Sequence, residues 1–171
     1  MGVVRIRPMA ADDAPRVLAI YAEGIATGHA TFEREAPPWP AFDARFHASP
    51  RLVAAAEASV LGWACLSPTS AREVYRGVAE VSVYVAAEAR GGGLGGRLLR
   101  ALIEASEAAG FWTLQASLFA ENAASLRAHR ACGFRMLGVR ERVGRMGHGP
   151  WQGRWRDTTL MERRSVFVGT D

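Results

Sequence analysis

The chain has 171 residues and a mass of 18.5 kDa, the size of one ordinary domain. Hydrophobic residues make up 49% of it and charged residues 22%, so we do not expect a mostly disordered chain. It shows no apolar run long enough for a membrane-spanning helix and no apolar N-terminal segment typical of a secretory signal. Two cysteines exclude a disulfide-dense scaffold and a four-thiolate zinc site. We therefore expect one cytoplasmic domain over residues 1–171, with a core over 3–164 and a tail over 165–171.

The net charge of +4 raises the question of nucleic-acid binding. All 21 of the Lys and Arg residues are arginines, and they are spread along the chain. Asn122 is the only asparagine and alanine is abundant, so the arginine usage is also typical of a coding sequence rich in G and C. Because a small anionic ligand explains local arginine clusters equally well, we expect neither a nucleic-acid nor a membrane partner.

Apolar periodicity and turn residues predict eleven elements in the order β-α-α-β-β-β-α-β-α-β-β. The predicted strands lie over residues 3–7, 51–57, 60–66, 78–85, 113–119, 134–143 and 155–163. The predicted helices start at Asp12, Trp39, Leu94 and Asn122 and end before Thr27 and at Ala48, Gly110 and Ala131. This order indicates an α/β (α+β) fold around one central sheet.

The most informative segment is a glycine-rich turn between a predicted strand and a predicted helix. Five of the six residues from Gly91 to Gly96 are glycines. Without Cβ atoms, backbone N–H groups can converge on an anion, and the helix N-terminus adds positive potential. A tight turn without a ligand needs fewer glycines, so we expect a phosphate or pyrophosphate group to bind here.

Two familiar phosphate loops do not fit this turn. A Walker A loop requires a lysine, and the chain has none. Gly91, Gly93 and Gly96 satisfy G-x-G-x-x-G, but about half the chain precedes them and Glu121 follows some 30 residues later. A dinucleotide-binding fold places this motif after its first strand, with an acidic residue about 20 residues on. Coenzyme A is the third option.

Two motifs resemble the GNAT family of N-acetyltransferases. Arg90-x-x-Gly93-x-Gly95 looks like the pyrophosphate loop of that family, and the segment from Asn122 to Gly133-Phe134 resembles its second short helix. The resemblance covers nearly the whole chain, from Ile6 to Arg163. It implies a GNAT fold, with a mixed central sheet of about seven strands and helices on both faces, and an acetyl-CoA co-substrate.

A narrower resemblance points to the phosphinothricin and methionine sulfoximine acetyltransferase branch. It rests on Glu80-Val-Ser-Val-Tyr-Val85, Tyr75-Arg76, Thr31-Phe32-Glu33 and Gly153-Arg-Trp155-Arg-Asp157. Tyr21-Ala22-Glu23 departs from the branch, which usually carries an asparagine there, and the stretch 146–152 is longer than usual. Both departures flank the expected acceptor pocket, so the acceptor stays open. The branch implies a homodimer.

Amide formation from a thioester needs a neutral amine, and an alkyl ammonium with a pKa near 10 is only about one part in a thousand neutral at pH 7. Glu80 lies on the polar face of the strand 78–85 and, by resemblance, is the general base. His129 stands seven residues after Asn122, where many members carry a tyrosine, and can protonate the departing thiolate. We expect direct attack by the amine rather than an acetyl-enzyme, because neither cysteine lies in a recognised site.

The resemblance also assigns the binding residues. A backbone N–H between Val83 and Val85 is expected to meet the oxyanion, and arginines suit an acceptor carboxylate or phosphinate. The expected coenzyme-binding residues are Val83, Tyr84, Val85, Arg90, Gly91, Gly92, Gly93, Leu94, Gly95, Gly96, Asn122 and Ser125. The expected acceptor-binding residues are Phe32, Glu33, Arg72, Tyr75, Arg76 and Ser82.

Other functions remain possible on the sequence alone. His29, His47 and His148 have no metal-ligand spacing, so we expect no metal. The same fold could acetylate a peptide N-terminus, a polyamine or an antibiotic, or could serve as a non-catalytic acyl-CoA sensor. Intact Glu80 and His129 argue against the sensor.

Overall fold

A computed structural model describes residues 3–57 and 59–170 of the chain. Its strands and helices follow the predicted order. The strands are β1 (Arg5–Pro8), β2 (Arg51–Ala56), β3 (Ser59–Pro68), β4 (Val78–Val85), β5 (Thr113–Phe119), β6 (Arg135–Arg145) and β7 (Trp155–Arg164). The helices are α1 (Ala14–Ala26), α2 (Trp39–Arg45), α3 (Leu94–Ala108) and α4 (Ala123–Ala131), with short 3-10 turns between some elements.

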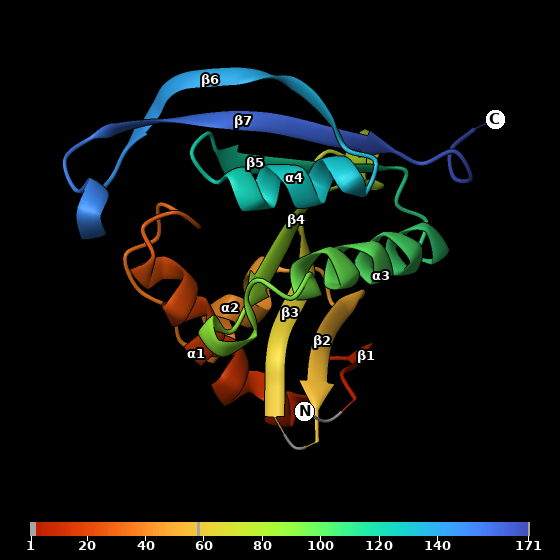
Figure 1. Cartoon of the computed structure of the whole chain (residues 1–171). Helices are drawn as coiled ribbons and strands as arrows, with labels where there is room; N and C mark the ends of the chain where they lie inside the picture. The colour runs from red at the N-terminus through yellow and green to blue at the C-terminus, as the bar shows by residue number, and fades with distance from the viewer. Residues whose placement is uncertain (1–2, 58, 171) are drawn as a thin grey trace.

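The strands form one mixed seven-stranded sheet in the order β1-β2-β3-β4-β5-β7-β6. Every neighbouring pair is antiparallel except β4 and β5, which are parallel. In Figure 1, β5, β6 and β7 cross the top of the molecule and β1–β4 lie below them. The predicted GNAT-like α/β fold is confirmed.

Helices cover both faces of the sheet, so its central strands are buried on both sides. One core cluster joins Leu98 and Leu102 of α3 to Ala64 and Leu66 of β3. The other joins Ile20 of α1 and Phe42 of α2 to Trp63 and Cys65 of the same strand. Successive residues of β3 thus serve opposite cores, which explains its nearly continuous apolar run.

The parallel ladder between β4 and β5 is short. It joins Val78–Thr113, Ala79–Leu114 and Glu80–Gln115 and then stops. Beyond this point β4 stays paired with β3 as far as Val85, while β5 stays paired with β7 as far as Phe119. The two strands therefore diverge, and an opening lies in the middle of the sheet.

The boundary of α2 differs from its predicted end at Ala48. The helix ends at Arg45, because Phe46 adopts an extended conformation and the His47 N–H donates to the Leu66 carbonyl of β3 at 2.8 Å. A contact 19 residues away in sequence ends the helix, and local pattern does not reveal it. In the described part of the chain, no helix combines the length and apolarity needed to cross a membrane.

Candidate functional site

A cleft of about 770 Å³ lies between the end of β4 and α4, beyond the point where β4 and β5 part. Its walls are the end of β4, the glycine-rich turn and the first turn of α4. All of the expected coenzyme-binding residues except Gly92 line it. The fold thus brings together two motifs that are separated by some 30 residues of sequence.

The glycine-rich turn has a conformation that only glycine adopts freely. Gly91 and Gly93 have φ values of 83° and 75°, and a Cβ on either would meet open space. Gly93 is the N-cap of α3, with no side-chain cap, so backbone N–H groups of the first turn are free to bind an anion. Arg90 is anchored by a hydrogen bond from its Nε to the Val85 carbonyl at 3.0 Å. The backbone at this end of the cleft is therefore suited to an anion, and the binding itself stays a prediction.

The edge of β4 that faces the cleft carries backbone groups with no strand opposite them. The Ala86 N–H donates to Leu61 on the β3 side at 2.9 Å. Because N–H groups of successive strand residues point in opposite directions, those of Val83 and Val85 point toward the cleft. They are available to an extended ligand or to an oxyanion, as the sequence predicts.

A smaller pocket of about 220 Å³ lies on the α1–α2 side and joins the cleft. The two cavities share His29, Ala30, Val83, Tyr84, Asn122, Ser125 and His129. Glu80 and Ser82 enter the smaller pocket from β4, Phe32 from the loop after α1, and Arg45 from the end of α2. A ligand in each cavity would meet the other beside Val83 and His129.

Glu80 lines the smaller pocket and is partly buried. Burial raises the pKa of its carboxyl above the ordinary value, and the positive charges of Arg45 and Arg140 partly offset this. A carboxylate with a raised pKa holds a transferred proton better than an exposed glutamate does. The position suits a general base.

His129 is buried on α4, and its two ring nitrogens have different surroundings. Nδ1 lies 2.8 Å from the Ser125 carbonyl oxygen, so Nδ1 carries the hydrogen, while Nε2 has no partner among the described residues. Burial lowers the pKa of the imidazole, opposed by that hydrogen bond. At neutral pH the ring is therefore uncharged with a free lone pair on Nε2, and it can donate from Nε2 only after accepting a proton there.

Asn122 is the N-cap of α4, as predicted. Its Oδ1 accepts from the Ser125 N–H at 3.1 Å, and its Nδ2 donates to the His29 carbonyl at 3.1 Å. Both ends of the amide thus have protein partners. Asn122 therefore links α4 to the loop that carries His29. Beyond the cap, the sequence predicts only a contact with the coenzyme.

Four of the expected acceptor-binding residues do not line either cavity of the described chain. Glu33 pairs with Arg45 at 2.9 Å on the surface. Arg72 stacks on Tyr75, and Arg76 stacks on Trp112, on an exposed turn before β4. Turns with similar composition can point toward or away from a site, and sequence spacing does not distinguish them.

Sequence reasoning missed Arg45, the arginine that does line the smaller pocket. Its Nη1 also donates to the Tyr21 hydroxyl at 3.3 Å, deep in the α1–α2 core. Nothing in the local pattern marks it, because it stands in the last turn of a short helix where a basic residue is common.

The part of the chain that the structure describes contains no cluster of three His, Cys, Asp or Glu side chains able to hold a metal ion. The absence of a metal stays a prediction.

Comparison with known proteins adds a decisive observation to this geometry. The model of the acetyltransferase (GNAT) family matches residues 9–134. The chain belongs to the GNAT family. It is 38% identical over 164 residues to a phosphinothricin N-acetyltransferase of Alcaligenes faecalis, covering 92% of this chain and 81% of the relative. It is 37% identical to an L-methionine sulfoximine/L-methionine sulfone acetyltransferase of Pseudomonas paraeruginosa, covering 92% of each.

Solved structures give the same family. A GNAT superfamily phosphinothricin acetyltransferase of Sinorhizobium meliloti, in complex with AcCoA, is 31% identical with a TM-score of 0.86, covering 98% of this chain and 91% of that one. A ribosomal-protein-alanine N-acetyltransferase of Brucella melitensis is 35% identical with a TM-score of 0.82, covering 94% and 99%. This GNAT protein is an N-acetyltransferase, as the sequence predicts.

The glycine-rich turn makes a testable contrast between neighbouring glycines. Gly93→Ala places a side chain at a φ of 75°, which costs about 1–2 kcal/mol. Gly92→Ala adds its Cβ in equally open space, and Gly92 is not among the positive-φ glycines. Denaturant unfolding should therefore show a lower free energy of unfolding for Gly93→Ala. For Gly92→Ala the free energy of unfolding should stay within about 0.5 kcal/mol of wild type. Equal losses would contradict the assigned backbone conformation.

Proposed function

We propose that this GNAT enzyme transfers the acetyl group of acetyl-CoA to the amine of a small amino-acid-like acceptor, of the phosphinothricin or methionine sulfoximine type. The observation that carries the proposal is the junction of the two cavities, with an anion-binding turn at one end and Glu80 at the other. The names of the relatives support the same acceptor class.

Acetyl-CoA would occupy the larger cleft. Its pyrophosphate would bind the N–H groups from Gly91 to Gly96, and its pantetheine arm would lie along the unpaired edge of β4, beside Val83 and Val85. The thioester would then reach the junction near His129. The S. meliloti relative, solved with AcCoA, supports this co-substrate.

The acceptor amine would enter from the smaller pocket and lose one proton to Glu80. Its lone pair forms the C–N bond at the thioester carbon, and the N–H of Val83 or Val85 stabilises the oxyanion. The nitrogen then loses its second proton to the free Nε2 of His129. When the C–S bond breaks, that proton passes to the sulfur, which gives the amide, free coenzyme A and one net proton from Glu80.

Arg45 is our proposed partner for the acceptor's carboxylate. It lines the same pocket as Glu80, and it lies close enough to influence the pKa of that carboxyl. An α-amino acid presents an ammonium and a carboxylate on one carbon, which matches a carboxylate and a guanidinium facing one small pocket. The cavity of about 220 Å³ suits such a molecule better than a peptide chain.

The test is release of free thiol from acetyl-CoA with phosphinothricin, methionine sulfone, the amine that methionine sulfone gives on decarboxylation, a polyamine and a short alanyl peptide. We expect turnover with the amino acids. Arg45→Gln should raise the KM for methionine sulfone by about 10- to 100-fold, the worth of a hydrogen bond to a charged group, and change that of the decarboxylated amine by less than about threefold.

Arg76→Gln is the comparison variant, because Arg76 is one of the two arginines, with Arg72, that the sequence predicts at the acceptor. It should leave both KM values nearly unchanged. If Arg76→Gln raises the KM for methionine sulfone and Arg45→Gln does not, the acceptor's carboxylate binds at the exposed turn before β4 instead. Turnover with the peptide alone would replace the proposed acceptor class, and tight acetyl-CoA binding without any turnover would favour a sensor.

Replacing the proposed base tests the chemistry. Glu80→Gln should lower kcat/KM at neutral pH by about 10²- to 10⁴-fold, and the deficit should shrink at higher pH as free amine accumulates. In wild type, kcat/KM should fall on the acid side of its pH profile, at a pH above the ordinary glutamate pKa. This fall should be absent from the profile of Glu80→Gln. Glu104→Gln, on the exposed face of α3, is the control.

Glu80→Gln should melt at a higher temperature than wild type. Because burial raises the pKa of Glu80, its ionised form costs stability at neutral pH, and glutamine removes that cost. Wild-type activity in a well-folded Glu80→Gln would refute the assignment.

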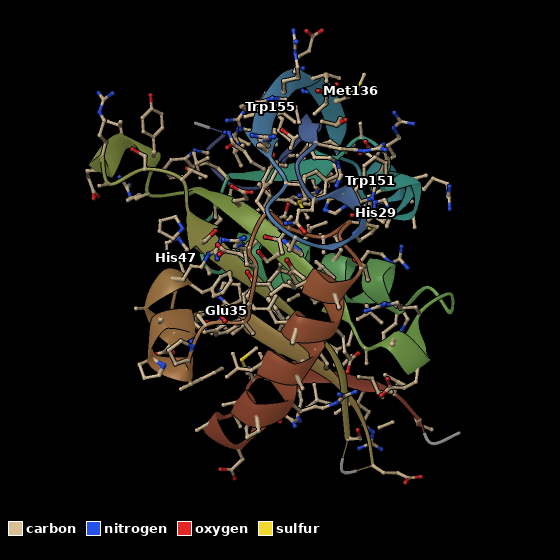
Figure 2. All side chains as sticks on the ribbon, turned by 90° about the vertical axis from the view of Figure 1, so that its left-hand side faces the viewer. His29, Glu35, His47, Met136, Trp151 and Trp155 are labelled. Carbon is tan, nitrogen blue, oxygen red and sulfur yellow. The ribbon has the colours of Figure 1, made fainter. Side chains whose placement is uncertain are left out.

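We also propose a homodimer built on the β6 edge. In the described residues β6 pairs with β7 alone, and five large apolar side chains of these two strands are exposed: Met136, Leu137, Val139, Val143 and Trp155. Figure 2 shows Met136 and Trp155 at this end of the molecule. An edge strand with exposed apolar residues is a typical association surface.

Light scattering after size-exclusion chromatography checks the dimer. The wild-type mass should be twice that of the chain, and Val139→Asp should halve it. Val166→Asp, at a more exposed valine of the C-terminal segment, should not change it. A wild-type monomer would refute the proposal.

A further inference from the structure

Arg156 is a fully buried arginine on β7, with 1% of its surface exposed. Its Nη1 donates to the Gly28 carbonyl at 2.9 Å, and its Nη2 donates to Glu121 Oε2 at 3.0 Å. The guanidinium carbon lies 4.0 Å from the ring centre of Phe119 and 4.3 Å from that of Trp151. Two aromatic rings and two oxygens therefore hold one cation.

The partners of Arg156 come from three separate connections of the chain. Gly28 belongs to the loop after α1, Phe119 and Glu121 to the end of β5 and the turn that follows it, and Trp151 to the stretch 146–152 between β6 and β7. A Cβ on Gly28 would lie 3.1 Å from Pro150 and 3.3 Å from Trp151, so the loop and the stretch are in close contact. The unusually long stretch has a structural role here.

Two of these connections continue directly into the junction of the two cavities, and the stretch 146–152 packs against one of them. His29 follows Gly28 and lines both cavities. Its ring packs edge-on against Trp151 with ring centres 5.5 Å apart, and Figure 2 shows the two residues near each other. Asn122 follows Glu121, caps α4 and donates to the His29 carbonyl. The same helix carries His129. Arg156 thus sets the relative position of the groups that form the junction without lining either cavity.

The arrangement is costly for a purely structural device. The Arg156 side chain is 1% exposed and the Glu121 side chain 39% exposed, so the removal of the arginine charge from water offsets most of its attraction to Glu121. Here the Nε of Arg156 is buried without a partner, which adds to the cost. Apolar packing could join the same connections more stably, whereas a planar cation with fixed donors defines their positions relative to one another.

We infer that Arg156 is a positioning residue, which holds the loop at Gly28–His29 and the start of α4 so that coenzyme and acceptor meet. The inference rests on the proposed function for its kinetic consequence. Its structural consequence, the shape of the coenzyme cleft, stands independently because Glu121 and Asn122 line that cleft.

The experiment compares Arg156→Met, Glu121→Gln and the double variant with wild type. Arg156→Met alone leaves the Glu121 carboxylate without its partner. The double variant removes both charges and should recover much of the melting temperature lost in Arg156→Met. The matched control is Arg163→Met/Glu107→Gln, a pair 2.8 Å apart that joins the same strand to α3 away from both cavities.

The measurements are the melting temperature, the Kd of coenzyme A by calorimetry, and kcat and KM. In the double variant we expect a Kd raised about tenfold and a kcat lowered about 10- to 100-fold, because small misplacements of reacting groups carry losses of this size. Glu121→Gln alone should change the Kd and kcat less than the double variant does, because Arg156 and its other contacts stay in place. The control pair should change the melting temperature alone.

A double variant with wild-type Kd and kcat would overturn the inference and leave Arg156 a structural residue. The inference is also overturned if the control pair Arg163→Met/Glu107→Gln lowers kcat and raises Kd as much as the double variant does. Should Arg156→Met fail to fold, Arg156→Lys, which keeps the charge without the fork of donors, is expected to show the same kinetic losses. If wild type turns over no acceptor, the proposed function fails, and the Kd still decides the role of Arg156.

Discussion

The separation of β4 from β5 after three paired residues is the constraint on which the site depends. Each strand is committed to another neighbour, β4 to β3 and β5 to β7, so the gap between them cannot close by pairing. In a sheet covered by helices on both faces, unpaired backbone groups are costly. In the proposed complex, the pantetheine arm along the edge of β4 would supply the missing partner for these groups.

Two consequences follow from the divergence of these strands. Because side chains alternate along β4, Glu80, Ser82 and Tyr84 face the α1–α2 side, while Val81, Val83 and Val85 face α3. The proposed acceptor pocket and the hydrophobic support of the proposed coenzyme cleft are thus built from one strand. The glycine-rich turn follows the same strand, so the proposed anion site is held in place relative to the proposed base, Glu80.

Local chemistry made much of this architecture predictable. The N-cap Asn122, the alternation along 78–85 and the glycines at 91–96 all act within a few residues of sequence. Arg45 was missed, and Arg156 was recognised only as part of a family motif with no role of its own, for the opposite reason. The contact between Arg156 and Gly28 spans 128 residues, and whether a helix-end arginine enters a pocket depends on packing that no local pattern records. Arg72, Tyr75 and Arg76 were expected near the acceptor, and the fold places them on an exposed turn.

A crystal structure of the enzyme with coenzyme A and methionine sulfone would test the central claim most directly. The account predicts pyrophosphate on the turn from Gly91 to Gly96, the pantetheine arm along β4, and the acceptor amine within hydrogen-bond distance of Glu80 and facing the thiol. Coenzyme bound outside the gap between β4 and β5, or an acceptor amine remote from Glu80, would contradict it.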